Sequence, residues 1–411
     1  MRRILIVGAG HAGLQLALGL RQSGYEVTVV SNRTPQEIHD GQVTSSQCMF
    51  GAALAHEREL GINHWDGECP PVEGISLSVP APDGSGAKAI DWASRLHDPA
   101  QSVDQRLKIP RWMDDLEAAG GRLVIEDAGT PELERHAAEN DLVVVAAGKG
   151  EIARLFGRTP ERSPYELPMR ALALTYVTGM TPRPEYSAVS FNIVPTVGEY
   201  FVFPALTTGG PCEIMVFEGV PGGPMDCWAG VSSPAEHLEK SLWILDTFMP
   251  WEAERCRQVE LTDDRGILAG RFSPTVRNPI GVLPSGAAVL GLADAVMLND
   301  PITGQGSNNA SKMAAAYLAA IRARGEGPYD RAFMAQTFED FWTAYGQYVT
   351  GWTNALLSPP PPHVLELLGA GNAHAAVAER FVNGFDDPRD FYDWFMTPEK
   401  AQGYLAAVGA A

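Results

Sequence analysis

Six residues near the N-terminus have the type and spacing that bind a dinucleotide, and they read Gly8-Ala9-Gly10-His11-Ala12-Gly13. In this G-x-G-x-x-G pattern the first glycine allows a tight turn and the second lets backbone approach a pyrophosphate. The third lets a helix pack closely on a strand. The apolar run Ile4–Val7 predicts that strand, and residues 14–20 predict the helix, whose N-terminus would face the pyrophosphate. The sequence therefore predicts a dinucleotide site at the start of the chain.

The end of the second predicted strand, Glu26–Val30, indicates which dinucleotide fits. An NAD-binding domain usually has Asp or Glu at this point, where the carboxylate accepts hydrogen bonds from the ribose hydroxyls. This chain has Ser31, Asn32 and Arg33 instead. The missing carboxylate disfavours a nicotinamide dinucleotide and favours a flavin.

A second glycine-rich segment lies about 280 residues downstream. The apolar run Ala288–Ala293 ends in Asp294, and Asp300-Pro301 leads into residues 304–309 ahead of a predicted helix over 311–324. This pairing with the N-terminal motif resembles the FAD-dependent aromatic hydroxylases. The resemblance implies that Asp294 contacts the ribityl or pyrophosphate portion of FAD. It also implies that backbone N–H groups and a helix dipole stabilise an anionic reduced flavin.

Two further positions refine this resemblance. The segment Val103–Leu107 resembles the arginine site that these enzymes have near the FAD phosphates, which implies this role for Arg106. Single-component hydroxylases have an Asp-Gly pair at the end of the strand that here reads Val143–Gly148, and Ala147 replaces the Asp. The loss of that carboxylate disfavours direct reduction by NAD(P)H. We therefore expect the flavin to arrive reduced from a separate reductase.

Over essentially its whole length the chain resembles the oxygenase component of two-component styrene and indole monooxygenases. The resemblance includes residues 6–10, 103–107 and 291–307 and the tail segments 352–354 and 397–399. The Trp-x-Trp-x-Ile-Pro signature of flavin-dependent halogenases does not occur in the sequence. The cofactor-binding residues that the resemblance implies are Gly8, Gly10, His11, Ala12, Gly13, Asn32, Arg33, Arg106, Gly148, Asp294, Pro301, Gly304, Gly306, Ser307, Asn308 and Asn309.

The elements that must position these residues indicate an α/β fold. The apolar run Leu142–Val145 is typical of a parallel strand buried on both faces. Residues 165–265 alternate strand-like runs with Gly/Pro turns and have one helical pattern, Pro234–Phe248. We expect a Rossmann FAD domain of the glutathione-reductase type, an inserted and mostly antiparallel substrate sheet, and C-terminal helices. The expected FAD domain comprises residues 1–70, 100–165 and 266–330, the substrate domain 71–99 and 166–265, and the helical segment 331–411.

Six positions of the substrate pocket distinguish the styrene branch of this family from the indole branch. The styrene type has Asn, Val and His at the positions of Ser45, Gln47 and Met49. It has Tyr and His at the positions of Val72 and Ile75, and Ser at the position of Ala100. This chain resembles the indole type, in which Gln47 could accept the indole N–H. Taken singly, Met49, Val72 and Ile75 are also compatible with an ordinary apolar core. The pocket residues that the resemblance implies are Ser45, Ser46, Gln47, Met49, Val72, Ile75, Ala100, Pro301 and Ile302.

The resemblance also implies the reaction. Reduced FAD and O₂ form a C4a-hydroperoxyflavin, which epoxidises the C2=C3 bond of indole to indole 2,3-epoxide, and indoxyl and indigo follow. A dry apolar pocket protects the hydroperoxide from water, so no acid–base residue is required. Three alternatives stay open: a styrene-preferring epoxidase of the same family, a self-sufficient NAD(P)H-dependent aromatic hydroxylase, and a non-catalytic flavin carrier.

Composition limits the partners and the location. The 411 residues are 45% hydrophobic, and the net charge of −19 disfavours nucleic acid and anionic membranes as partners. No apolar stretch reaches the roughly 18 residues of a membrane span. The chain goes straight from Met1-Arg2-Arg3 into the first strand, so we expect no signal peptide. The five cysteines form no C-x-x-C pair, which predicts no metal site and a cytoplasmic location. The expected partners are an NADH:flavin reductase and a small aromatic substrate, and a homodimer stays open.

Overall fold

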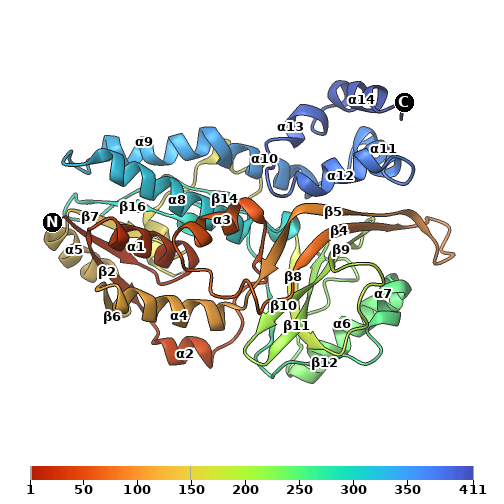
Figure 1. The fold of residues 1–411 in the computed structure, drawn as a ribbon, viewed down its shortest axis with the longest axis horizontal. Helices are drawn as coiled ribbons and strands as arrows, with labels where there is room; N and C mark the ends of the chain where they lie inside the picture. The colour runs from red at the N-terminus through yellow and green to blue at the C-terminus, as the bar shows by residue number, and fades with distance from the viewer. Residues whose placement is uncertain (1, 149, 411) are drawn as a thin grey trace.

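The computed structural model describes residues 2–148 and 150–410, which two β-sheets organise (Figure 1). The first sheet has six strands in the order β15-β16-β7-β1-β2-β6. All are parallel to their neighbours except the edge strand β15. The carboxyl ends of the parallel strands therefore meet at one edge. The strands are Ile280–Val282 (β15), Ala288–Gly291 (β16), Leu142–Val145 (β7), Arg3–Val7 (β1), Glu26–Ser31 (β2) and Arg122–Ile125 (β6).

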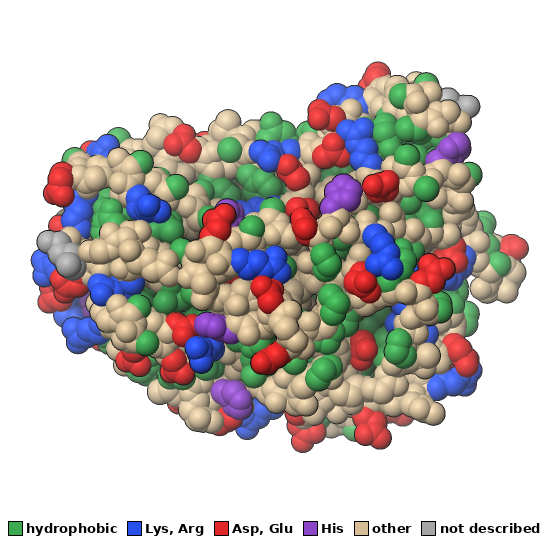
Figure 2. All heavy atoms as spheres, viewed as in Figure 1, with side chains coloured by type: hydrophobic (Ala, Val, Ile, Leu, Met, Phe, Trp, Pro, Cys, Tyr) green, Lys and Arg blue, Asp and Glu red, His purple; other side chains and the backbone are tan. Residues whose placement is uncertain are grey.

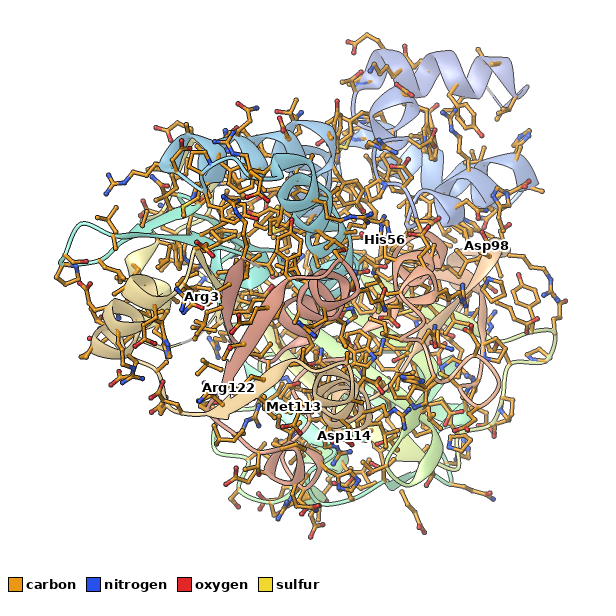
Figure 3. All side chains as sticks on the ribbon, turned by 60° about the vertical axis from the view of Figure 1, so that its left-hand side comes forward. Arg3, His56, Asp98, Met113, Asp114 and Arg122 are labelled. Atoms are coloured by element: carbon orange, nitrogen blue, oxygen red, sulfur yellow. The ribbon has the colours of Figure 1, made fainter. Side chains whose placement is uncertain are left out.

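Amphipathic helices cover this sheet. On α4, Met113 is buried and its neighbour Asp114 is exposed, and Figure 3 labels both side chains. The sequence predicted that α8 begins at Ser311, and this start was wrong because the helix begins at Gly306. The helix α4 begins at Gln105 because the Asp104 carboxylate caps it by accepting from the Arg106 N–H at 2.8 Å. The helices are His11–Gln22 (α1), Pro35–His39 (α2), Gly51–Glu59 (α3), Gln105–Ala118 (α4), Thr130–Glu139 (α5), Gly306–Arg324 (α8) and Arg331–Phe341 (α9).

The second sheet has nine strands in the order β12-β8-β11-β10-β9-β4-β5-β3, with β13 also paired to β8. It is antiparallel except between β4 and β9. The strand β5 continues to Ser102, past residue 99 where the sequence placed a domain boundary. The strands are Cys48–Met49 (β3), Val72–Pro80 (β4), Lys88–Ser102 (β5), Ala171–Thr178 (β8), Ala188–Val194 (β9), Gly198–Thr207 (β10), Gly210–Gly219 (β11), Glu260–Leu261 (β12) and Ile267–Gly270 (β13).

Helices flank the second sheet on both sides (Figure 1). The helix α6 (Pro234–Phe248) lies beside β8, and α7 (Pro250–Arg255) contacts β9, where Trp251 Nε1 donates to Asn192 Oδ1 at 2.7 Å; only α6 was predicted. The C-terminal helices lie over β5, where Trp92 Nε1 donates to the Leu368 carbonyl at 2.8 Å. They are Gln347–Leu356 (α10), Pro362–Ala370 (α11), Ala375–Asn383 (α12), Phe391–Trp394 (α13) and Pro398–Ala407 (α14), and the π-helix Trp342–Gly346 precedes them.

The remaining elements are short. They are the strands Thr275–Val276 (β14) and Met297–Leu298 (β17), and the 3-10 helices Ile152–Leu155, Pro160–Arg162, Ala293–Ala295 and Pro301–Thr303. Together the two sheets and the C-terminal helices confirm the predicted α/β class with a mostly antiparallel second sheet. Over residues 2–148 and 150–410, no helix combines the length and apolar character that crossing a membrane requires. Acidic and basic side chains are interspersed on the face that Figure 2 shows.

Candidate active site

A cavity of about 880 Å³ opens at the carboxyl ends of the parallel strands. Val7, Ser31 and Ala146 contribute the ends of β1, β2 and the segment after β7 to its wall. Open α/β sheets bind their ligands at this edge. The volume lies within the range of about 300–1,000 Å³ that is usual for small-molecule and cofactor sites.

The glycines of the N-terminal motif are required for two different reasons. Gly8 has φ +114°, and an added Cβ would lie 2.9 Å from the backbone of Ala146 and Ala147. A Cβ on Gly13 would overlap the Gly8 carbonyl oxygen, so this glycine lets the helix pack on the strand. A Cβ on Gly10 or Gly306 would meet no atom within 4 Å, although both residues line the cavity. Backbone is thus open to a ligand at these two positions, which fits a dinucleotide.

Most of the predicted cofactor-binding residues come together on this cavity. Gly13, Asn308 and Asn309 do not line it, and Asn308 instead ties the helix α8 to β3 by donating to the Cys48 carbonyl at 2.9 Å. Asn309 is buried. The predicted cofactor residues on the cavity wall are Gly8, Gly10, His11, Ala12, Asn32, Arg33, Arg106, Gly148, Asp294, Pro301, Gly304, Gly306 and Ser307.

Arg106 joins the two sheets as well as lining the cavity. Its guanidinium donates to Asp104 at 2.9 Å, to Thr207 on β10 at 3.0 Å and to both carboxylate oxygens of Asp263 at 3.0 Å. These bonds engage four of the five guanidinium N–H groups. A phosphate role for Arg106 stays a prediction, and it would have to share the guanidinium with two carboxylates.

His11, in the glycine motif, contacts a buried ion pair. Its Nε2 lies 3.2 Å from Glu57 Oε1, which also accepts from Lys108 Nζ at 2.6 Å. Glu57 and Lys108 are 0% and 2% exposed. Burial alone would raise the pKa of Glu57, but Lys108 and His11 outweigh it and hold that pKa below its usual value. Burial lowers the pKa of His11, so its imidazole is neutral beside the cavity near pH 7.

Replacing Lys108 by Met is expected to destabilise the chain by about 3–5 kcal/mol, because Glu57 would keep a buried charge without its cation. Denaturant unfolding of the purified chain measures this. Arg58→Met is the matched control, since its pair with Asp66 is 42% and 49% exposed and contributes about 1 kcal/mol or less. Equal losses in the two variants would contradict the assignment of Lys108 as the required partner of Glu57.

The loop over residues 41–47 carries a hydrogen-bonded chain at the cavity. The Tyr176 hydroxyl donates to the Ser45 carbonyl at 2.7 Å and accepts from Gln47 Nε2 at 3.0 Å. Ser45 Oγ donates to Gln47 Oε1 at 2.7 Å. Because the single Tyr176 proton goes to Ser45, the Gln47 amide must turn its nitrogen toward Tyr176. Gln47 itself has φ +40°, in the left-handed region that non-glycine residues seldom adopt.

Five apolar residues predicted for the pocket are buried and do not line the cavity: Met49, Val72, Ile75 and Ala100 lie on the second sheet, and Ile302 lies in the 3-10 helix Pro301–Thr303. Val72 on β4 pairs with Ala100 on β5, and Met49 on β3 pairs with Gln101. Val72, Ile75, Ala100 and Ile302 belong to one apolar cluster. Ser45, Ser46, Gln47 and Pro301, by contrast, lie on the cavity wall.

Several cavity residues were missed by sequence reasoning. The segment Glu126–Gly129 lines the cavity directly after β6, and Gln105 donates to Ser45 Oγ at 3.2 Å. Because the segment Glu126–Gly129 directly follows a parallel strand, its position in the sequence could have indicated that it lines the cavity. Tyr176 lies in the middle of an apolar strand, and no spacing signal marks its hydroxyl as part of a loop anchor.

The described residues include no cluster that could hold a metal ion and no disulfide. Within residues 2–148 and 150–410, no three His, Cys, Asp or Glu side chains are grouped to hold a metal ion. All five cysteines are free, and burial raises the pKa of the Cys48 thiol to about 12. The cavity wall therefore offers backbone N–H groups, hydroxyls, the amides of Asn32, Gln42, Gln47 and Gln105, two guanidinium groups and several carboxylates.

Comparisons with known proteins agree with this geometry. The model of the styrene monooxygenase A putative substrate binding domain matches residues 148–255, and an FAD binding domain model matches residues 3–67. Styrene monooxygenase StyA of Pseudomonas fluorescens is 31% identical over 408 residues, 97% of this chain and 96% of that protein. Styrene monooxygenase StyA of a Pseudomonas sp is 30% identical over the same shares.

Solved flavoproteins share the fold. A triple mutant of the flavin-dependent brominase Bmp2 is 14% identical with a TM-score of 0.63 over 98% of each chain. A flavoprotein/dehydrogenase of Cytophaga hutchinsonii is 14% identical with a TM-score of 0.64 over 100% of each chain. PqsL of Pseudomonas aeruginosa is 14% identical with a TM-score of 0.61 over 95% of this chain and 98% of that chain. At this identity the three structures establish the fold alone.

Proposed function

The chain belongs to the styrene monooxygenase A family, and we propose that it is the oxygenase component of a two-component system that epoxidises indole. It is an FAD-dependent monooxygenase of the styrene monooxygenase type. We propose indole as the preferred substrate, an NADH:flavin reductase as the partner, and indole 2,3-epoxide as the product that leads to indoxyl and indigo.

The cofactor supplies the oxygen chemistry, and the chain supplies the binding site. Bound reduced FAD provides the two electrons that let O₂ give one oxygen atom to the substrate and the other to water. Gly10 and Gly306 would hold the dinucleotide by open backbone, and Gly148 packs against Asp294 at the end of the cavity wall.

The Gln47 amide is the observation that supports indole. Its nitrogen donates to Tyr176, and among the described residues its oxygen accepts one hydrogen bond, from Ser45. A carbonyl oxygen has two lone pairs, so one stays available to the indole N–H. Styrene has no N–H and cannot use it. We propose that Tyr176 keeps the amide in this orientation and so contributes to the preference.

Wild-type enzyme is expected to have a higher kcat/KM for indole than for styrene, and Gln47→Met is expected to lower this ratio. Methionine is used rather than valine because its unbranched side chain tolerates the left-handed backbone of residue 47 better than a β-branched side chain does. The lost hydrogen bond in a dry pocket is worth about 1–3 kcal/mol, or roughly ten- to a hundredfold in the ratio. The measurement is kcat/KM for both substrates with reductase in excess.

Gln336→Val, on the exposed face of α9, is the control and should leave the ratio unchanged. Tyr176→Phe should lower the ratio in the same direction as Gln47→Met, because it releases the amide. An equal fall for both substrates in Gln47→Met would remove Gln47 from substrate recognition. A wild-type preference for styrene would contradict the indole assignment and leave the family membership unaffected.

The second candidate is a styrene-preferring enzyme of the same family. Both curated relatives bear the name styrene monooxygenase, which favours it. The same pair of kcat/KM values decides between the two candidates.

A further inference from the structure

Four ionisable side chains are buried together next to the turn that lines the cofactor cavity. Glu199 on β10 and Glu218 on β11 lie opposite each other in an antiparallel pair. Asp300 immediately precedes Pro301, and Arg170 immediately precedes β8. None of the four is more than 7% exposed. The group thus contains three carboxyl groups and one guanidinium, all of them buried.

The guanidinium is committed to one of the three carboxylates. Arg170 donates to both oxygens of Glu199, at 2.7 Å and 3.0 Å, in the bidentate geometry of a strong ion pair. Its remaining hydrogen bonds go to the carbonyls of Met169 at 2.8 Å and Leu357 at 3.2 Å. Within the described residues, the guanidinium therefore makes no hydrogen bond to Glu218 or Asp300.

The Glu218 and Asp300 carboxyl groups lie near enough to each other that the charge of Asp300 raises the pKa of Glu218. Within residues 2–148 and 150–410, no N–H or O–H group donates to either oxygen of Glu218 or to Asp300 Oδ2. Two ionised carboxylates in contact would repel each other strongly in a dry interior, and such pairs keep one proton between them. A proton on one carboxyl supplies the donor that the other lacks.

We propose that Glu218 and Asp300 share one proton and that this pair positions the Pro301–Gly304 turn of the FAD site. The pair is distinct from the residues that line the cavity. The inference depends on FAD occupying the cavity and does not depend on the choice between indole and styrene.

The link from the pair to the cavity runs through the backbone. Asp300 Oδ1 accepts from the Ile302 N–H at 3.2 Å and so caps the 3-10 helix Pro301–Thr303. Gly304 follows with φ +63°, and both Pro301 and Gly304 line the cavity. If Asp300 turns away from an ionised Glu218, the cap is lost and the turn loosens on the cofactor side.

The sign of the pH effect follows from the burial. Burial, and then the charge of Asp300, raises the pKa of Glu218 well above its usual value. Such a group stabilises the folded state fully below the unfolded pKa, and this stabilisation is lost as the pH rises through the folded pKa. FAD affinity and the stability of the FAD-free chain should both decrease as the pH rises. For one proton, the fall in affinity is at most about tenfold per pH unit.

Glu218→Gln tests the pair because its amide donates to Asp300 as the protonated acid does but cannot titrate. The dissociation constant of FAD is measured by fluorescence titration of the full chain from acid to alkaline pH. Wild type should lose affinity as the pH rises. Glu218→Gln should match wild type within about threefold at the acid end and stay flat. Infrared spectra should show a protonated carboxyl band in wild type that Glu218→Gln lacks.

Glu254→Gln, in an exposed pair with Arg257, is the matched control and should follow wild type at every pH. Asp300→Asn also removes one titrating carboxyl and should flatten the profile, so it serves if Glu218→Gln does not fold. A pH dependence that is identical in wild type and in both variants would overturn the proposal, as would the absence of a protonated carboxyl band. Failure of wild type to bind FAD at any pH would instead overturn the cofactor site.

Discussion

Replacing Gly13 by alanine is expected to destabilise the chain by about 3 kcal/mol or more, whereas Gly10→Ala should change stability by less than about 1 kcal/mol. The added Cβ of Gly13→Ala meets the Gly8 carbonyl oxygen, which is backbone and cannot move aside without shifting β1 from α1. The added Cβ of Gly10→Ala meets no protein atom within 4 Å. It should instead weaken FAD binding by about 1–3 kcal/mol, or roughly ten- to a hundredfold.

Denaturant unfolding and FAD fluorescence titration separate the two effects. Gly209→Ala is the matched control, because a Cβ there also meets nothing within 4 Å and the residue lies in the turn between β10 and β11. It should alter neither quantity. Unchanged FAD affinity in a folded Gly10→Ala variant would move the dinucleotide site away from this cavity.

The second large effect concerns the source of electrons. The chain alone is expected to leave NADH and NADPH unoxidised, and adding a flavin reductase with FAD should start turnover of indole or styrene. Ala147 lines the cavity after β7 where self-sufficient hydroxylases have a carboxylate, so the site lacks the group that this class uses in its own reduction.

NADH absorbance, substrate consumption and hydrogen peroxide are followed with and without the reductase. As a control, FAD reduced chemically under nitrogen and then mixed with air-saturated substrate should give a single turnover without any reductase. Rapid NADH oxidation by the chain alone, coupled to product, would refute the two-component assignment.

The cofactor side of the site could be predicted from the sequence because local rules govern it. Gly8, Gly10 and Gly13 have roles that depend on a turn and a helix start within six consecutive residues. The downstream segment around Gly304 and Gly306 is likewise a turn followed by a helix start, so a short stretch of sequence is sufficient to predict it. The positions of both on one cavity confirm that the two segments meet, since the parallel sheet places its carboxyl ends at one edge.

The substrate side could be predicted only in part, because it depends on register between distant segments. Tyr176 reaches Ser45 across 131 residues of sequence, and this contact exists only because β8 lies beside the loop. The hydrogen bonds by which Arg106 joins the two sheets depend in the same way on Asp263, which lies 157 residues away in the sequence. Short-range patterns carry no information on such pairs, so Met49 and Val72 could not be separated from ordinary core by periodicity.

The left-handed backbone of Gln47 limits which residues this chain can accommodate at position 47. At φ +40° asparagine, aspartate and glycine are accommodated most easily, whereas a β-branched residue would cost about 1–3 kcal/mol. A substitution to valine would therefore strain the loop of this chain. A β-branched residue is accommodated at position 47 only when the loop backbone changes together with the side chain.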